Sequence, residues 1–356
     1  MVHSQHKNWI HTHLLWIYNV SVPIETLKPP EDQKKPRKAE ERDDKPLRKS
    51  KASEPKSNPE IPREDNPYFK KLGIPHLDEI RSDVFEKGKV KIVLHPFYEM
   101  LLQSDTSFDE ELWNDIKKHP EKYDGKKPPG LQYCEQWIIR ELNRTLRESG
   151  EEGLSQRYWR VLEMVQEYQA LMTAKDSTDT YLYILPKYHT FEGDHNKHHP
   201  ELYDALIDIV KHGANKSSAF IESEQWSNGS LNDSDAALMQ ILIPKQTTLE
   251  LSGGYIGKCM DNLFKSLKEP TNRSGWKVHV NVADSTPVMF FDNNNPGSLT
   301  DIPKENQPTY KAGQQFSSMD EVLAFVESNS QLNRFILEKS RQHLASQRKP
   351  AFVTYK

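Results

Sequence analysis

The sequence predicts a Rossmann-like, three-layer α/β/α domain with a mainly parallel sheet, an inserted helical segment and a long N-terminal tail. Three observations lead to this prediction. Short β-branched runs closed by turn residues are typical of buried parallel strands. These runs alternate along the chain with stretches of helical periodicity, which indicates parallel strands joined by crossover helices. Finally, the first 65 residues have a composition that cannot form a core.

The tail is defined by charge and proline. Residues 28–65 contain twelve Lys or Arg, ten Asp or Glu and seven Pro, with Leu47 and Ile61 as the only large apolar residues. Such a segment cannot bury enough apolar surface to offset the entropy cost of ordering it. We therefore expect a disordered tail over 1–65 and an α/β domain over 66–356. For the apolar stretch at 14–18, a targeting segment, a short docking helix and a mispredicted start all stay open.

Composition excludes several classes of protein. The net charge of -4 offers no general basis for binding nucleic acid, and we expect no nucleic-acid partner. No apolar run reaches the roughly 20 residues of a membrane-spanning helix, so we expect no membrane association. The two cysteines cannot build a disulfide framework, which favours a reducing, cytoplasmic location.

Five strands are expected in chain order. The runs that predict them are 89–94 (KVKIVL), 180–185 (TYLYIL), 217–221 (SSAFI), 247–251 (TTLEL) and 276–282 (WKVHVNV). Right-handed crossovers in such a sheet bring the loops that follow the strands to one edge, where ligands of open α/β sheets bind.

Helical periodicity fills the segments between these strands. A short helix over 78–85 is expected to lead into the first strand. An inserted helical segment, about 107–174, follows that strand with helices at 107–118, 131–149 and 154–174; Ser107 and Glu110 have the spacing of a capping box. The remaining helices are expected at 200–211, 233–243, 255–267, 319–326 and 331–344.

The first candidate for chemistry is Cys259, near the expected start of a helix. The positive end of a helix dipole, together with Lys258, lowers the pKa of a thiol and favours the nucleophilic thiolate. Gly253 and Gly254 allow a tight turn whose N–H groups can bind an oxyanion or a ligand. The alternative is that Cys259 is a small buried hydrophobe packed against the sheet.

The second candidate is the loop after the second strand. It holds four histidines and two carboxylates, and His189, Asp194 and His195 are its predicted metal ligands. Imidazole and carboxylate suit zinc, iron or manganese, so a divalent metal is the expected cofactor. A simply solvated loop of the same composition is the alternative.

Three further residues follow strands and therefore face the expected ligand edge. His95 closes the first strand and could act as a base, or it could be a satisfied histidine beside a proline turn. Glu222 and Glu224 follow the third strand and could bind a cation or a basic ligand, although carboxylates at strand ends are often only solvated.

Together these features resemble the isochorismatase and nicotinamidase family of cysteine hydrolases. The resemblance spans about residues 90–286 and is strongest in three pieces: the strand and glycine pair at 249–254 (LELSGG), Cys259, and the strand with its acidic end at 280–286 (VNVADST). The family also binds a metal through two histidines six positions apart, the spacing of His189 and His195. The resemblance implies an isochorismatase-like fold with Cys259 as nucleophile.

Three positions depart from the family pattern. The catalytic aspartate that closes the first strand is replaced by His95, and the first metal aspartate by Lys187. The catalytic lysine falls on 222–224 (ESE). A thiol without its base and its lysine lacks the acid–base half of the mechanism, although His95 could serve as a substitute base.

Two hypotheses follow, and whether the protein is an enzyme stays open between them. The favoured one is a non-catalytic isochorismatase-like protein with a degenerate site that binds a small-molecule ligand or a partner. The alternative is a divergent cysteine hydrolase of a small amide or related substrate. In that case Cys259 is the nucleophile, His95 the base and the Gly253–Gly254 turn the oxyanion site.

The metal hypothesis gives a first testable prediction. If the histidine loop binds a divalent ion, protein purified without chelator should contain that ion, and the double variant His189→Ala, His195→Ala should lose it. Metal analysis and calorimetric titration with zinc measure the effect. A wild-type protein that contains no ion and takes up none would leave the loop as a solvated one.

Overall fold

The computed structural model describes most of the second of two units of the chain. The units are Met1–Lys56 and Ser57–Lys356. The described residues are 66–86, 88–97, 100, 108–149, 158–187, 200–223, 228–256, 259–281, 286–287, 303–306, 309–311, 313–335, 337–338 and 354–355. The predicted tail over 1–65 lies outside them.

The central sheet is parallel and has the strand order of a doubly wound Rossmann-like fold. Its order is β3-β2-β1-β4-β6-β8, and all its strand pairs are parallel. The strands are β1 (Lys89–Leu94), β2 (Thr180–Leu185), β3 (Ser218–Glu222), β4 (Thr248–Gly253), β6 (Lys277–Val280) and β8 (Thr354–Tyr355). The chain order reverses direction between β1 and β4, which is the switch point where such folds bind ligands.

The five predicted strands are confirmed, and three short strands were not predicted. β8 extends the sheet beyond β6, while β5 (Tyr255–Ile256) and β7 (Thr286–Pro287) form a separate parallel pair. The helix predicted over 255–267 is therefore wrong at its start, because Tyr255 and Ile256 are extended. That helix, α10 (Cys259–Ser274), begins at Cys259.

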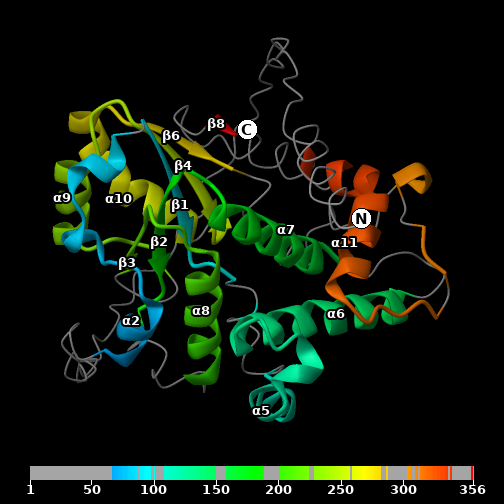
Figure 1. Cartoon of the computed structure of the whole chain (residues 1–356). Coiled ribbons are helices and arrows are strands. Elements are labelled where there is room, and N and C mark those ends of the chain that lie inside the picture. The colour runs from blue at the N-terminus through cyan, green and yellow to red at the C-terminus, as the bar shows by residue number, and fades with distance from the viewer. Residues whose placement is uncertain are drawn as a thin grey trace, which may run out of the picture. The chain divides into compact units, whose positions relative to one another are not determined.

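The two faces of the sheet carry separate cores, which gives three layers. Alternate residues of β2 face opposite sides: Tyr183 belongs to one apolar cluster and Leu182 to the other. Leu182 packs in the cluster of α9 (Asp233–Leu242) and α10, whereas Tyr183 packs in the cluster of α8 (Pro200–Gly213). Figure 1 shows α9 and α10 together on the side of the strands opposite α8. The three-layer α/β prediction is thus confirmed.

The helical insertion after β1 is present. It consists of α5 (Glu110–Lys118), the short 3-10 helix η4 (Pro120–Tyr123), α6 (Pro129–Ser149) and α7 (Tyr158–Lys175). The predicted cap of its first helix was wrong. Asp109 occupies the N-cap and accepts the N–H of Leu112 at 2.7 Å, so the helix starts later than the capping-box pattern at Ser107 suggested. Before β1, the predicted helix is replaced by two 3-10 turns, η2 (Leu77–Glu79) and η3 (Ser82–Phe85), preceded by α2 (Pro67–Leu72).

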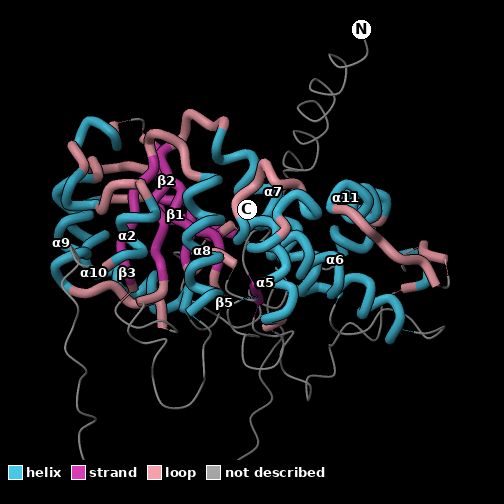
Figure 2. Tube along the Cα trace, turned by 60° about the horizontal axis from the view of Figure 1, so that its bottom comes forward, coloured by secondary structure: helices cyan, strands magenta, loops and turns pink. Residues whose placement is uncertain are grey.

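One helix from the far end of the chain packs onto this insertion. α11 (Met319–Ser328) lies in the long connection from β6 to β8, which also contains η10 (Lys304–Asn306). The Asn143 side chain of α6 binds the backbone of Phe316 twice: its amide donates to the carbonyl at 2.9 Å and its oxygen accepts the N–H at 2.8 Å. Figure 2 shows α5, α6, α7 and α11 gathered beside the sheet. In the described part of the chain, no helix has both the length and the apolar character needed to cross a bilayer.

The insertion is joined to the sheet layer where α6 crosses α8. A Cβ at Gly130 would lie 2.5 Å from the carbonyl oxygen of Ala205 and 2.7 Å from its Cα. The buried Asp208 of α8 accepts the N–H of Gly130 at 3.1 Å, and Lys71 of α2 pairs with the same carboxylate at 2.8 Å. Only a residue without a side chain allows the two helix backbones to approach this closely.

This crossing gives a prediction about stability. Gly130→Ala should lower the free energy of unfolding by about 1–3 kcal/mol, because the added methyl group collides with the backbone of α8. A backbone cannot move aside by changing rotamer, as a side chain can. Urea unfolding measures the change. The matched control is Gly125→Ala in an exposed turn, where the new Cβ would be at an ordinary 3.4 Å from its neighbours. Equal stabilities of the two variants would contradict the tight crossing.

Candidate functional site

The carboxyl ends of β1 and β4 meet at the switch point. The two strands are in parallel register with Leu94 opposite Gly253. Residues that follow these strands therefore start from the same edge of the sheet. His95 and the Gly253–Gly254 turn begin there, and Cys259 follows five residues after Gly254. The Cys259–His95 hypothesis requires β1 and β4 to be neighbours in the sheet, and they are.

Both glycines are required by the packing of the protein itself. Gly253 has φ 71° and Gly254 has φ 59°, in the left-handed region that disfavours side chains. A Cβ at Gly253 would lie 2.3 Å from the carbonyl oxygen of Leu94. At Gly254 it would lie 3.0 Å from both Cys259 Sγ and a Leu94 methyl carbon. The glycine turn therefore packs closely against β1 and against the thiol, and its predicted role in binding an oxyanion or a ligand stays a prediction.

Cys259 is completely buried as the first residue of α10. It belongs to the apolar cluster that includes Leu94, Met260 and Leu263. Gly254 lies against its sulfur, and a Cβ at Gly229 would lie 3.0 Å from its Cβ. The thiol thus sits in the core between α10 and the sheet, at the first residue of the helix.

His95 is completely buried and turned toward the end of β3. The ring Nε2 of His95 lies 2.9 Å from the hydroxyl oxygen of Ser223, and its backbone N–H donates to the carbonyl of Ile184 on β2 at 2.8 Å. Burial lowers the pKa of His95 to about 3, so the imidazole is neutral at ordinary pH. Its φ of 45° is unusual for a residue with a side chain. His95 therefore occupies the predicted edge as a hydrogen-bonded, neutral group.

Ser223 was missed as a site residue. It is buried at the end of β3, where its N–H donates to the carbonyl of Leu185 at 2.9 Å. The only signal in the sequence was its place in the 222–224 stretch that falls on the lysine position of the resemblance. Glu222, which was predicted, is the last residue of β3 and is half-buried.

Several predicted site residues lie outside the described part of the chain. These are the metal ligands His189, Asp194 and His195, and the binding residues Lys258 and Glu224. Within the ranges that the structure describes, no three His, Cys, Asp or Glu side chains are grouped to hold a metal ion. The metal site and the two binding residues therefore stay predictions.

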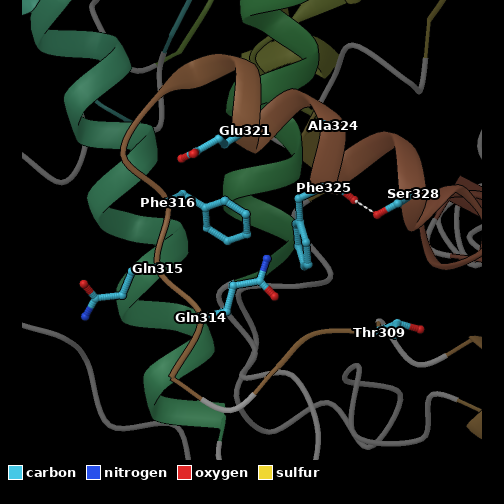
Figure 3. A pocket seen from close by; sticks show the side chains of 8 residues that line it. All are labelled: Thr309, Gln314, Gln315, Phe316, Glu321, Ala324, Phe325 and Ser328. Carbon is cyan, nitrogen blue, oxygen red and sulfur yellow. Dashed lines mark hydrogen bonds between the residues drawn. The ribbon is translucent and has the colours of Figure 1, made fainter.

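A shallow groove lies elsewhere, on α11 and the segment before it. Its volume is about 400 Å³, and Figure 3 shows its lining residues: Thr309, Gln314, Gln315, Phe316, Glu321, Ala324, Phe325 and Ser328. The rings of Phe316 and Phe325 lie side by side with centroids 5.1 Å apart. None of the predicted site residues lines this groove, so the carboxyl edge of the sheet remains the candidate site on the strength of its topology.

Comparison with known proteins gave no match to a family model, to a curated protein or to a solved structure.

The burial of His95 gives a prediction about pH. The unfolded imidazole titrates near 6.5 and the folded one near 3, so the unfolded chain binds the extra proton between these values. Stability should therefore fall as pH decreases through this window, by up to about 1.4 kcal/mol per pH unit from this residue. In His95→Gln the dependence should be weaker by that amount.

Urea unfolding at several pH values between 4 and 7 measures this slope. His119→Gln, which removes a half-exposed imidazole, is the control for losing a histidine. If the wild-type protein and His95→Gln have parallel profiles, the neutral, buried state of His95 is wrong.

Proposed function

We propose that this domain is a non-catalytic, isochorismatase-like α/β protein that binds a small-molecule ligand at the carboxyl edge of its sheet. The observation that carries the proposal is the complete burial of Cys259 in an apolar cluster. A nucleophile must reach its substrate, and reactive cysteines sit in partly exposed, electropositive surroundings. Cys259 instead packs as a small hydrophobe beneath the Gly254 turn.

The pair at the ends of β1 and β3 also supports this proposal. The resemblance assigns a catalytic aspartate to the position of His95 and a lysine to the 222–224 stretch that contains Ser223. Here these positions hold an imidazole and a hydroxyl that bind each other at 2.9 Å. With a pKa near 3, His95 is a poor base at neutral pH, because proton transfer is most efficient when the pKa of the base is near the working pH.

The second candidate function is the divergent cysteine hydrolase. It is favoured by the pairing of β1 with β4 and by the start of α10 at Cys259, because the thiol and the imidazole then lie on segments that follow neighbouring strands. In that mechanism the Cys259 thiolate would attack an amide carbonyl, with the thiol proton passing to His95 and then to the leaving amine. Water would release the acyl group.

The reactivity of the thiol separates the two functions. In a Cys134→Ala background, iodoacetamide should alkylate Cys259 slowly, and His95→Ala should leave the pH dependence of that rate unchanged. Mass spectrometry of the Cys259 peptide measures the rate, and urea-denatured protein gives the rate of the exposed thiol. A fast reaction with a midpoint well below the free thiol pKa of about 8.5, shifted upward in His95→Ala, would establish the hydrolase instead.

Nicotinamide, a small amide of the class that the resemblance implies, serves as the probe ligand for the same variants. Binding without catalysis predicts that it raises the melting temperature at millimolar concentration while releasing no ammonia. Ammonia release that is lost in Cys259→Ala supports the hydrolase. If nicotinamide neither raises the melting temperature nor is hydrolysed to ammonia, this edge is not a site for that class of ligand.

A further inference from the structure

The turn that leaves β1 contains two residues in a conformation that costs free energy. His95 has φ 45° and Phe97 has φ 56°, with Pro96 between them. Each left-handed residue of this kind costs on the order of 1–3 kcal/mol and persists only where its surroundings hold it. The conformation of this turn, and with it the direction of the His95 side chain, therefore depends on its anchors.

Three anchors to other elements hold the turn. The His95 N–H donates to the carbonyl of Ile184 on β2, and its ring binds Ser223 after β3. The third anchor is Glu167 of α7, whose carboxylate accepts the N–H of Phe97 at 2.6 Å in a buried hydrogen bond. The first two anchors belong to the sheet, whereas Glu167 comes from the inserted helical segment.

We infer that Glu167 is a positioning residue for the candidate site. By accepting the Phe97 N–H, α7 fixes the exit turn of β1 and thereby the orientation of His95 toward Ser223. This inference rests on the proposed function only in calling the edge a ligand site. The coupling between Glu167 and the His95 ring can be measured without any ligand.

The side chain of Glu167 suits this task. It is nearly buried, with 9% of its surface exposed, on the face of α7 that packs into the core. Its reach from α7 brings one carboxyl oxygen to 2.6 Å from the Phe97 nitrogen, so the side chain spans from the insertion to the exit turn of β1. Glu163, one helical turn earlier and similarly buried with 6% of its surface exposed, provides a matched control.

Two substitutions separate positioning by the hydrogen bond from an electrostatic effect of a buried charge. Glu167→Gln keeps the length and an acceptor oxygen but loses the charge. Glu167→Asp keeps the charge, but its acceptor lies one methylene short of Phe97. The full chain is labelled with ¹⁵N-histidine, and the ring signals of His95 are assigned from their loss in His95→Gln.

Positioning predicts that the His95 ring signals move in Glu167→Asp and stay in place in Glu167→Gln and in Glu163→Gln. It also predicts amide exchange at Phe97 about tenfold faster in Glu167→Asp, as expected for the loss of one hydrogen bond. Signals that move in Glu167→Gln but not in Glu167→Asp would overturn the inference in favour of an effect of charge.

Unchanged signals in both variants would also overturn it, because the turn would then be fixed by the sheet alone. If Glu167→Asp fails to fold, Glu167→Leu takes its place, because it removes the acceptor while filling similar apolar space. Positioning then predicts shifted His95 signals and faster Phe97 exchange in Glu167→Leu, and unchanged signals overturn the inference. If the His95 ring signals move in Glu167→Asp but do not respond to nicotinamide in the wild-type protein, the positioning role is upheld and a binding site for this class of ligand is rejected. The two claims can therefore fail separately.

Discussion

The contact between the ends of β1 and β4 is the constraint on which the rest of this structure depends. β1 is the central strand from which the sheet extends in both directions, and β4 is the first strand of the second half. At their ends the backbone of Gly253 approaches the carbonyl of Leu94 so closely that no side chain could be accommodated. This approach places the start of α10 beneath the edge and aligns the two halves of the fold. The contact between β1 and β4 therefore determines which residues a site at this edge could use.

His95 and Ser223 form a pair without formal charge at the carboxyl edge of the sheet. A carboxylate and an ammonium group buried at the same two positions would stabilise each other, and removing one of them would leave an uncompensated charge that costs several kcal/mol. The imidazole and the hydroxyl present here instead form a hydrogen bond at 2.9 Å. Because burial lowers the pKa of His95 to about 3, this pair has little capacity for proton transfer at neutral pH.

The sequence was sufficient to predict the fold class and most of its elements, because strand and helix periodicities are local. The bounds of β1 and β2 coincide with the predicted runs. The extended pair at Tyr255 and Ile256 could not be predicted, since it depends on pairing with Thr286 and Pro287 far along the chain. Among the site residues, the place of His95 at the edge followed from its position after a strand. Its neutral state, its Ser223 partner and the burial of Cys259 depend on contacts between distant segments, which periodicity does not encode.

The docking of α11 onto α6 has a consequence for the order in which parts of this protein can fold during synthesis. The two helices are joined through Asn143 and Phe316, 173 positions apart in sequence, and Phe325 packs against Tyr158. During synthesis at roughly 5–20 residues per second, α6 and α7 leave the ribosome well before the segment that covers them. For that interval the apolar surface around Tyr158 lacks its cover, and the nascent chain carries a hydrophobic face of the kind that chaperones bind. The helices of the insertion are thus synthesised early, but their apolar surface is among the last to be covered.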